Sequence, residues 1–272
     1  MPITELQEPW LSEFRNLVRT GASTRDIHDP DCQIAFAAAE RSASEAFVDR
    51  EVQRVSLHQK SLCPLLEAFL GKVDRVLDVG CGSGGTTVAI AQSTVLRPGE
   101  VVGIDANQTA LHAAEIRTRG YQIGSQRISF RHCSAHDNFP FANNSFELAV
   151  CVSVLEFIPT LQGRQRLVRE MIRVIRPGGF IFLSTPNPYR LRELHSRRWL
   201  GDYRRRRGYP WSCIPRQLRK MVSPCKLVPT QKAVARQAAQ KLGLPGEWIP
   251  GWACSIPSFV LPWQKILARK PA

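Results

Sequence analysis

"VLDVGCGSGG", residues 76–85, decides the fold, because an apolar run leads directly into a turn rich in glycine. The run is typical of a buried strand, and four glycines in six positions indicate a sharp turn before a helix. Gly80, Gly82 and Gly85 fit the pattern G-x-G-x-x-G, and Asp105 follows twenty residues after the last of them. The pattern is typical of loops that hold a dinucleotide, although glycines that only turn the chain share it.

Short apolar runs alternate with helical stretches from residue 73 onward. The expected strands are 75–79, 101–105, 127–132, 145–153 and 179–185, and the expected helices are 85–94, 108–119 and 164–175. This alternation predicts an α/β fold with a doubly wound, mostly parallel sheet and helices on both faces. The last apolar run, 265–271, is predicted to close the sheet as an edge strand. Ligands of such sheets bind at the carboxyl ends of the strands, where the strand order reverses.

Two flanking segments differ from this core in composition. Residues 1–70 are rich in helix formers, and we expect Gly71 to cap their last helix. Residues 187–272 begin with an arginine-rich insertion and contain the aromatic residues Trp248, Trp252, Phe259 and Trp263. We therefore divide the chain into a helical extension (1–70), a core (71–186) and a carboxyl-terminal segment (187–272) that completes the sheet. The two additions are expected to form a cap over a ligand pocket.

The charge of the chain is concentrated in one place. Of a formal net charge of +14, the 31 residues from Arg190 to Lys220 carry +9, from ten arginines and one lysine against two acidic residues. Such a cluster is typical of a solvated loop or of a surface that binds nucleic acid or an anionic membrane. The tail aromatics fit core packing, an apolar pocket or contact with a membrane surface.

Cysteine spacing and hydropathy argue against a metal or redox site, a membrane span and a secretory signal. The eight cysteines are widely spread and lack the two-residue spacing of zinc and redox sites, so we expect buried thiols and no metal. No run approaches the about 18 apolar residues of a membrane span, and the first ten residues lack the pattern of a secretory signal. We expect a cytoplasmic protein; the sequence leaves its oligomeric state open.

Asp78 distinguishes between ligands of the glycine turn. It lies two residues before Gly80, at the end of the first strand. A carboxylate there would repel a pyrophosphate but attract a cationic group. A cationic nucleoside is therefore favoured over a dinucleotide.

With its glycine turn, Asp78 and Asp105, the chain resembles the class I S-adenosylmethionine-dependent methyltransferases, of the undecorated type that acts on quinones and natural products. The resemblance covers about residues 70–186. "VLDVGCGSGG" resembles the glycine motif of the family, "VVGIDAN" its second-strand acid, "FPFANNSFELAVCVSVLEFI" its fourth-strand segment and "IRPGGFIFLSTP" the turn into its fifth strand. These motifs occur in the family's order. The resemblance implies a Rossmann-like fold and S-adenosyl-L-methionine as cofactor.

The resemblance also implies the cofactor contacts. Gly80, Cys81 and Gly82 would bring their backbone against the methionine part, with Asp78 beneath it and Ser153 nearby. Asp105 would hold the ribose hydroxyls, and Ala106 would lie against the adenine.

One departure concerns the adenine amino group. Many relatives carry an aspartate in a "G-D-A" stretch, where this chain has "CSAHDNFPF". Ser134 stands nearest that position, or Asp137 after a shift. We expect Ala135 and His136 to lie beside the base.

The function implied is methyl transfer by in-line displacement to a small-molecule acceptor, lipid-like or a secondary metabolite, at oxygen or carbon. His195, Glu156 and His136 are candidate general bases, although a solvated or hydrogen-bonded role fits each of them too. Two alternatives stay open: an RNA methyltransferase that uses the arginine-rich segment, and a non-catalytic cofactor-binding subunit. The chain has "SVLEF" where enzymes that methylate base amino groups carry an N-P-P-Y or D-P-P-Y motif.

Overall fold

The computed structural model describes residues 9–21, 45–134, 137–187, 215–230, 233 and 263–272. Within them, seven strands form one sheet in the order β3-β2-β1-β4-β5-β7-β6. The strands are β1 Arg75–Val79, β2 Glu100–Asp105, β3 Ile128–His132, β4 Phe146–Val152, β5 Ile175–Pro186, β6 Lys226–Val228 and β7 Trp263–Arg269. The predicted α/β fold with a mostly parallel sheet is confirmed.

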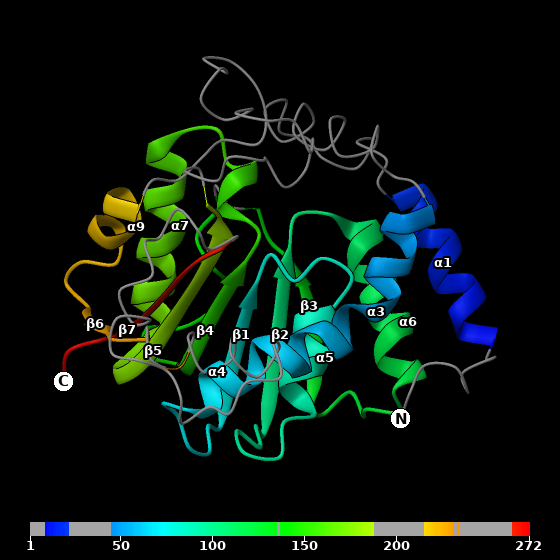
Figure 1. Cartoon of the computed structure of the whole chain (residues 1–272), viewed down its shortest axis with the longest axis horizontal. Coiled ribbons are helices and arrows are strands. Elements are labelled where there is room, and N and C mark those ends of the chain that lie inside the picture. The colour runs from blue at the N-terminus through cyan, green and yellow to red at the C-terminus, as the bar shows by residue number, and fades with distance from the viewer. Residues whose placement is uncertain (1–8, 22–44, 135–136, 188–214, 231–232, 234–262) are drawn as a thin grey trace, which may run out of the picture.

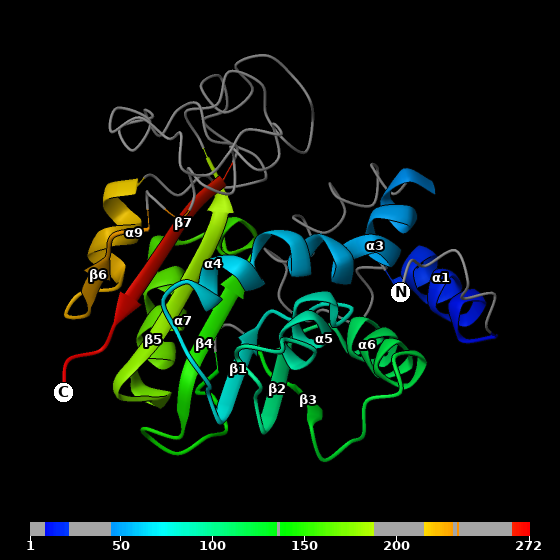
Figure 2. The ribbon, with the colours of Figure 1, turned by 60° about the horizontal axis from the view of Figure 1, so that its bottom comes forward.

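The helices cover both faces of the sheet (Figures 1 and 2). They are α1 Pro9–Gly21, α3 Glu45–Ser61, α4 Cys63–Glu67, α5 Gly85–Ala91, α6 Gln108–Gly120, the 3-10 turn η3 Leu155–Phe157, α7 Leu161–Val174 and α9 Pro215–Met221. Asn107 caps α6 through a bond from the Ala110 amide, and Thr160 caps α7 through one from Gly163. Such caps satisfy amides that the helix itself leaves unpaired.

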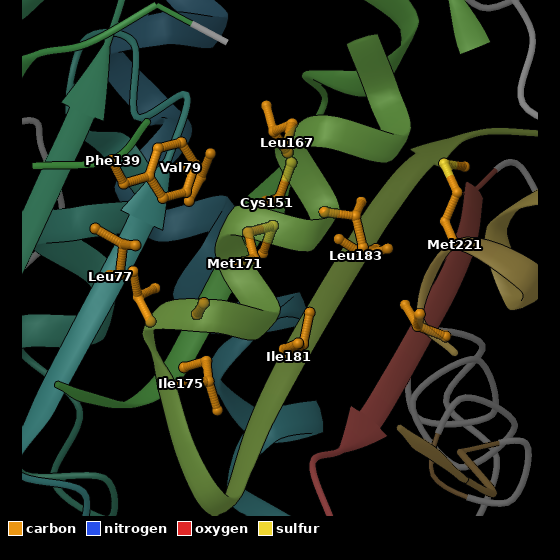
Figure 3. Packing of buried hydrophobic residues seen from close by; sticks show 14 of the residues in the cluster. Leu77, Val79, Phe139, Cys151, Leu167, Met171, Ile175, Ile181, Leu183 and Met221 are labelled. Carbon is orange, nitrogen blue, oxygen red and sulfur yellow. The ribbon is translucent and has the colours of Figure 1, made fainter. Parts of the chain in front are cut away.

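Strand alternation builds two separate cores. Leu77 and Val79 of β1 face α7 and α9, in a cluster with Leu183 and Met171 (Figure 3). Val76, the residue before Leu77, faces the cluster on the other side of the sheet, which includes residues of α4 and α5. Side chains alternate between the faces of a strand, so a strand buried on both sides is mostly apolar, and in β1 the exceptions are Arg75 and Asp78.

The strand order reverses between β1 and β4. β1 pairs in parallel with β2 on one side and with β4 on the other. The loops that follow these two strands leave in opposite directions at that point. The carboxyl ends of the parallel strands lie together at one edge of the sheet, called here the carboxyl edge. The glycine turn is one of these loops.

Two local predictions are wrong. The helix before β1 ends at Glu67, with Ala68 as its C-cap, and not at Gly71. The chain leaves the helix earlier because Leu70 and Val73 turn into the core. The last strand is not an edge strand: β7 pairs antiparallel with β5 and with β6, so β6 forms the edge.

Other predictions hold or lie outside the described residues. The five described cysteines, 63, 81, 133, 151 and 225, are buried free thiols, as expected. In the part of the chain that the structure describes, no helix is both long and apolar enough to cross a bilayer. The arginine-rich insertion up to residue 214 and the aromatic residues Trp248, Trp252 and Phe259 lie outside the described residues.

Candidate cofactor site at the carboxyl edge

The glycine turn is held against the end of β2. The amides of Gly80 and Cys81 both donate to the carbonyl of Ile104, at 2.8 and 3.0 Å. Gly80 has φ +70°, and a Cβ there would collide with the side chain of Val154, which follows β4. A residue with a side chain would therefore be strained and would push the turn away from β4.

Gly82 lies on the open side of the same turn. Its φ is +51°, and a Cβ built on it would meet no atom within 4 Å. Its amide donates to Oδ2 of Asp105 at 2.8 Å. The turn thus presents bare backbone to open space beside a carboxylate, which is what a ligand lying close to the main chain requires.

Two carboxyl groups end the neighbouring strands β1 and β2. Asp78 is 1% exposed, and its Oδ2 accepts from the Thr87 hydroxyl at 2.6 Å. Burial raises the pKa of Asp78 to about 7, and the nearby Asp105 adds to the rise. Both oxygens of Asp105 accept from backbone amides, of Gly82 and of Asn107. Burial also raises the pKa of Asp105.

This pair of carboxyls fits a cationic nucleoside. Like charges at the ends of adjacent strands repel, and a positively charged ligand between them and the turn would relieve the repulsion. Each Asp105 oxygen has a second lone pair, so both can still accept from ribose hydroxyls. The residues present therefore fit S-adenosylmethionine, whose contacts the sequence predicts here.

Other residues predicted to contact the cofactor lie just after β2 and β3. Ala106 directly follows β2, and its carbonyl accepts from the His132 ring at 3.1 Å. Ser134 follows β3 by two residues, and its amide donates to the Asp137 carboxylate at 3.2 Å. The sheet order therefore brings both residues to the carboxyl edge next to Asp105. Ala135 and His136 lie outside the described residues.

Ser153 and Glu156 lie after β4. Ser153 has a positive φ of 60°, and its amide donates to the carbonyl of Ser184 at 2.9 Å. Non-glycine residues in this region are often part of functional sites. Glu156 is 1% exposed and accepts from the Thr185 hydroxyl at 3.0 Å. Its Oε1 is buried without a hydrogen-bond partner, and burial raises its pKa to about 7. His195 lies outside the described residues.

Sequence reasoning missed a polar cluster behind the glycine turn. Glu51 of α3 accepts from the Ser83 hydroxyl, and Arg117 of α6 donates to both residues. A signal for Glu51 exists, since it is the acidic residue on the face of the helix that carries the buried residues Val48, Val52 and Val55. A charge on an apolar helix face usually has a buried partner.

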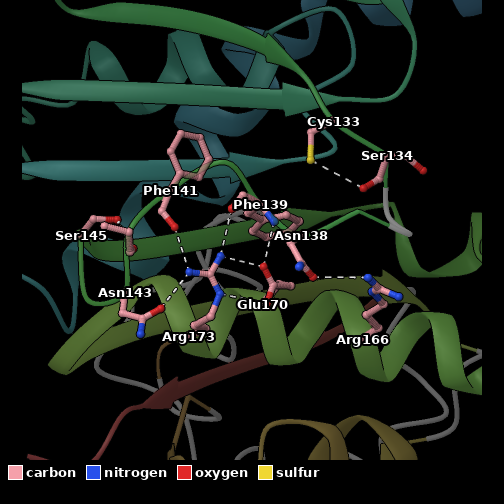
Figure 4. Close-up of polar contacts among 11 residues, drawn as sticks. Cys133, Ser134, Asn138, Phe139, Phe141, Asn143, Ser145, Arg166, Glu170 and Arg173 are labelled. Carbon is pink, nitrogen blue, oxygen red and sulfur yellow. Dashed lines mark hydrogen bonds and ion pairs between the residues drawn. The ribbon is translucent and has the colours of Figure 1, made fainter.

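A second missed cluster holds the chain between β3 and β4 (Figure 4). Arg173 of α7 donates to the carbonyls of Phe139 and Phe141 and to the side chain of Asn143. Glu170 pairs with Arg173 and accepts from the Phe139 amide at 2.8 Å. This cluster fixes the loop that returns from the predicted adenine side to β4.

Comparisons with known proteins find similar methyltransferases. Residues 77–183 match the family model described as a methyltransferase domain. A ubiquinone biosynthesis O-methyltransferase of Leptothrix cholodnii is 31% identical over 143 residues, or 51% of this chain and 57% of that protein. The probable methyltransferase ltbC of Aspergillus luteorubrus is 25% identical over 169 residues, or 60% of this chain and 57% of that protein. The chain thus spans little more than half the length of these relatives.

Solved structures show the same fold. A SAM-dependent methyltransferase from Methanosarcina mazei has a TM-score of 0.52 at 19% identity, covering 76% of this chain and 97% of that one. The [4+2]-cyclase SpnF has a TM-score of 0.50 at 21% identity, covering 83% and 81%. At such identities the likeness shows the fold alone.

The site and the comparisons together define a class. The glycine turn and the acid that ends β2 lie within the residues that the family model matches, as do most residues of the parallel strands β1 to β5. Residues 77–183 match a methyltransferase domain, and this match confirms the resemblance to class I, S-adenosylmethionine-dependent methyltransferases seen in the sequence.

Proposed function

We propose that this chain binds S-adenosyl-L-methionine at the carboxyl edge and transfers its methyl group to a hydroxyl of a small molecule. The observation that carries the proposal is the open backbone at Gly82, whose amide donates to Asp105, with the buried carboxyl of Asp78 on the neighbouring strand. The residues proposed to hold the cofactor are Asp78, Gly80, Cys81, Gly82, Asp105, Ala106, Ser134, Ala135, His136 and Ser153.

The cofactor, when bound, supplies a methyl group activated by a sulfonium. The protein's part is to bind, orient and exclude water, because an in-line displacement needs alignment above all. Asp105 anchors the ribose end, the backbone of 80–82 lies along the methionine end, and the buried carboxyl of Asp78 stabilises positive charge nearby.

A hydroxyl acceptor loses a proton during the transfer, and we propose Glu156 as the group that takes it. Its Oε1 is buried without a hydrogen-bond partner, while Thr185 orients Oε2. A carboxyl with a pKa of about 7 is half ionised near neutral pH, where a general base works best. The names of the ubiquinone O-methyltransferase relatives support transfer to oxygen.

We also propose that the flanking segments form the acceptor side. Residues 1–70 and 187–272 would surround the core 71–186, and the described helix α3 supports this by reaching the glycine turn. The acceptor is then a small molecule. The RNA and accessory-subunit alternatives gain no support from the relatives named above. The cytoplasmic location stays a prediction, supported by the five buried free thiols.

Calorimetric titration with S-adenosylhomocysteine tests the cofactor site. We expect micromolar binding by the full chain and its loss in Asp105→Ala. Asp74→Ala is the matched control, because Asp74 precedes β1 at the opposite edge of the sheet. A labelled-methyl screen of phenols and catechols, with total RNA alongside, then identifies the acceptor class. Absence of binding to the native chain, or label in RNA alone, would overturn the proposal.

A further inference from the structure

Helix α3 places a buried carboxylate against the tip of the glycine turn. Glu51 is 6% exposed, and its Oε2 accepts from the hydroxyl of Ser83 at 2.8 Å. Ser83 directly follows Gly82, so this hydrogen bond fixes the turn next to the open backbone at Gly82. It joins two segments that lie 32 residues apart in the sequence.

Helix α6 fixes the same serine from a second side. Arg117 is 1% exposed, and its Nη2 donates to the Ser83 hydroxyl at 3.2 Å and to the Glu51 carbonyl at 2.7 Å. Its guanidinium also lies over the ring of Phe14 of α1, 4.4 Å from the ring centre. Ser83 is therefore held by side chains of two helices, and those helices are held to each other.

The charge on Glu51 strengthens its hydrogen bond with Ser83. Burial alone would raise the pKa of Glu51, but Arg54, Arg117 and the hydrogen bonds lower it below its ordinary value. Arg54 also forms an ion pair with the Glu51 carboxylate. Glu51 is therefore ionised at neutral pH, and a charged acceptor makes a shorter and stronger hydrogen bond than a neutral one.

A continuous path of contacts links this cluster to the predicted ribose acid. Glu51 binds Ser83, the neighbouring Gly82 donates to Asp105, and Asp105 ends β2. The path consists of two hydrogen bonds and one peptide unit. A change in the orientation of Ser83 therefore moves the amide that orients Asp105.

We propose that Glu51 is a positioning residue for the cofactor: through Ser83 it holds the glycine turn in the conformation that binds the nucleoside. The inference rests on the proposed function, because it assigns α3 a role in cofactor binding at that same site. The contact between Glu51 and Ser83 also couples cofactor binding to the ordering of α3. A bound cofactor stabilises the turn and hence α3, and an ordered α3 strengthens cofactor binding by the same factor.

Calorimetric titration with S-adenosylhomocysteine on three variants of the full chain tests this. Glu51→Gln removes the charge with little change of shape, and Ser83→Ala removes the hydroxyl while leaving the buried charges in place. We expect each to weaken binding about tenfold. The matched control is Asp49→Asn, since Asp49 lies on the same helix but pairs with Arg15 at 3.0 Å, away from the turn. Its affinity is expected to stay within about twofold.

Two further readouts separate positioning from a structural role. The double variant Glu51→Gln/Ser83→Ala is expected to bind no more weakly than either single one, because both break one hydrogen bond. A purely structural role would instead lower the melting temperature of the free protein and leave the affinity unchanged, and this result would overturn the proposal. Ser83→Thr, which keeps a hydroxyl, is expected to retain binding.

Hydrogen exchange tests the coupling. Adding S-adenosylhomocysteine is expected to slow exchange in residues 45–61 of the native chain but not of Ser83→Ala. If the native chain binds the ligand and Glu51→Gln binds equally well, this inference fails while the proposed function stands. If the native chain binds none, both fail.

Discussion

Two buried glutamates at the carboxyl edge have opposite surroundings. Glu51 lies beside the glycine turn, on the β1 and β2 side, and Glu156 lies between the ends of β4 and β5. They are 6% and 1% exposed, so burial penalises the charge of both. Yet the pKa of Glu51 is lowered and that of Glu156 is raised to about 7.

The difference comes from their partners. Glu51 accepts from a hydroxyl and has two guanidinium groups close by, which outweigh the effect of burial. Glu156 accepts from one hydroxyl, and its other oxygen has no hydrogen-bond partner. A fixed charge suits a group that holds a loop, whereas a carboxyl that changes charge near neutral pH suits a group that exchanges a proton. The two sides of the edge thus match the two proposed tasks, holding the cofactor and accepting a proton.

Removing the buried cation Arg117 has the largest expected effect. Arg117→Met removes its hydrogen bonds to Ser83 and to the Glu51 carbonyl, and it leaves the Glu51 carboxylate with the ion pair to Arg54 and the hydrogen bond from Ser83. Breaking a buried pair in this way costs about 3–5 kcal/mol, because one charge stays buried without full compensation. Denaturant unfolding measures the loss. Arg54→Met removes the ion pair with the Glu51 carboxylate but should cost clearly less, since water reaches the partly exposed Arg54, and equal losses would contradict the larger role given to the buried Arg117.

The two glutamates should affect stability on opposite sides of their ordinary pKa of 4.5. Glu156 has a raised pKa in the folded state, so its contribution is fully present below pH 4.5 and is lost as pH rises through about 7. The loss amounts to at most about 3 kcal/mol. Glu51 has a lowered pKa, so its contribution is present above 4.5 and is lost as pH falls.

Unfolding free energies of Glu156→Gln and Glu51→Gln, measured from pH 3 to 8, sharpen this comparison. Glu156→Gln should remove part of the decline between about pH 4.5 and 7, to which Asp78 also contributes through its own raised pKa. Glu51→Gln should flatten the profile below about pH 4.5. Parallel profiles for the two variants would contradict the contrast between the two sites.

Glu156→Gln should also slow methyl transfer without weakening the binding of the cofactor. Loss of a general base lowers kcat about a hundredfold or more, which corresponds to about 2.7 kcal/mol. The native rate should rise as pH passes through about 7, as the carboxyl ionises. Single-turnover rates across this pH range measure both effects, and calorimetry with S-adenosylhomocysteine provides the control. An unchanged rate and pH profile in the variant would exclude Glu156 as the base.

The sequence predicts the β1 and β2 side of the edge well. Asp78, Gly82 and Asp105 are all within or next to apolar runs, so their places at strand ends follow from local patterns. Parallel strands then bring those ends to one edge of the sheet. The strand order β5-β7-β6 was not predicted, because an antiparallel strand from the end of the chain can join the sheet at more than one place.

The polar clusters were harder to predict for a physical reason. Glu51 and Ser83 lie 32 residues apart, and Arg173 reaches a carbonyl 34 residues away. Such contacts depend on how helices pack against the sheet, and periodicity does not report that packing. An acidic residue on an apolar helix face was a signal for Glu51. Arg173 gave none, because arginines near the end of an amphipathic helix are usually solvated.

The Arg173 cluster should give the smallest effect of the changes considered. Like Arg117, Arg173 pairs with a glutamate and holds a loop, but its side chain is 30% exposed. Water can therefore replace part of what Arg173→Ala removes, and we expect a loss of about 1 kcal/mol in unfolding free energy. The cofactor affinity should change little, because the contacts end at Phe139, Phe141 and Asn143 rather than at the glycine turn. Denaturant unfolding and calorimetry on the same sample check both points. A large loss of affinity in Arg173→Ala would mean that the loop after β3 controls the cofactor site as strongly as α3 does.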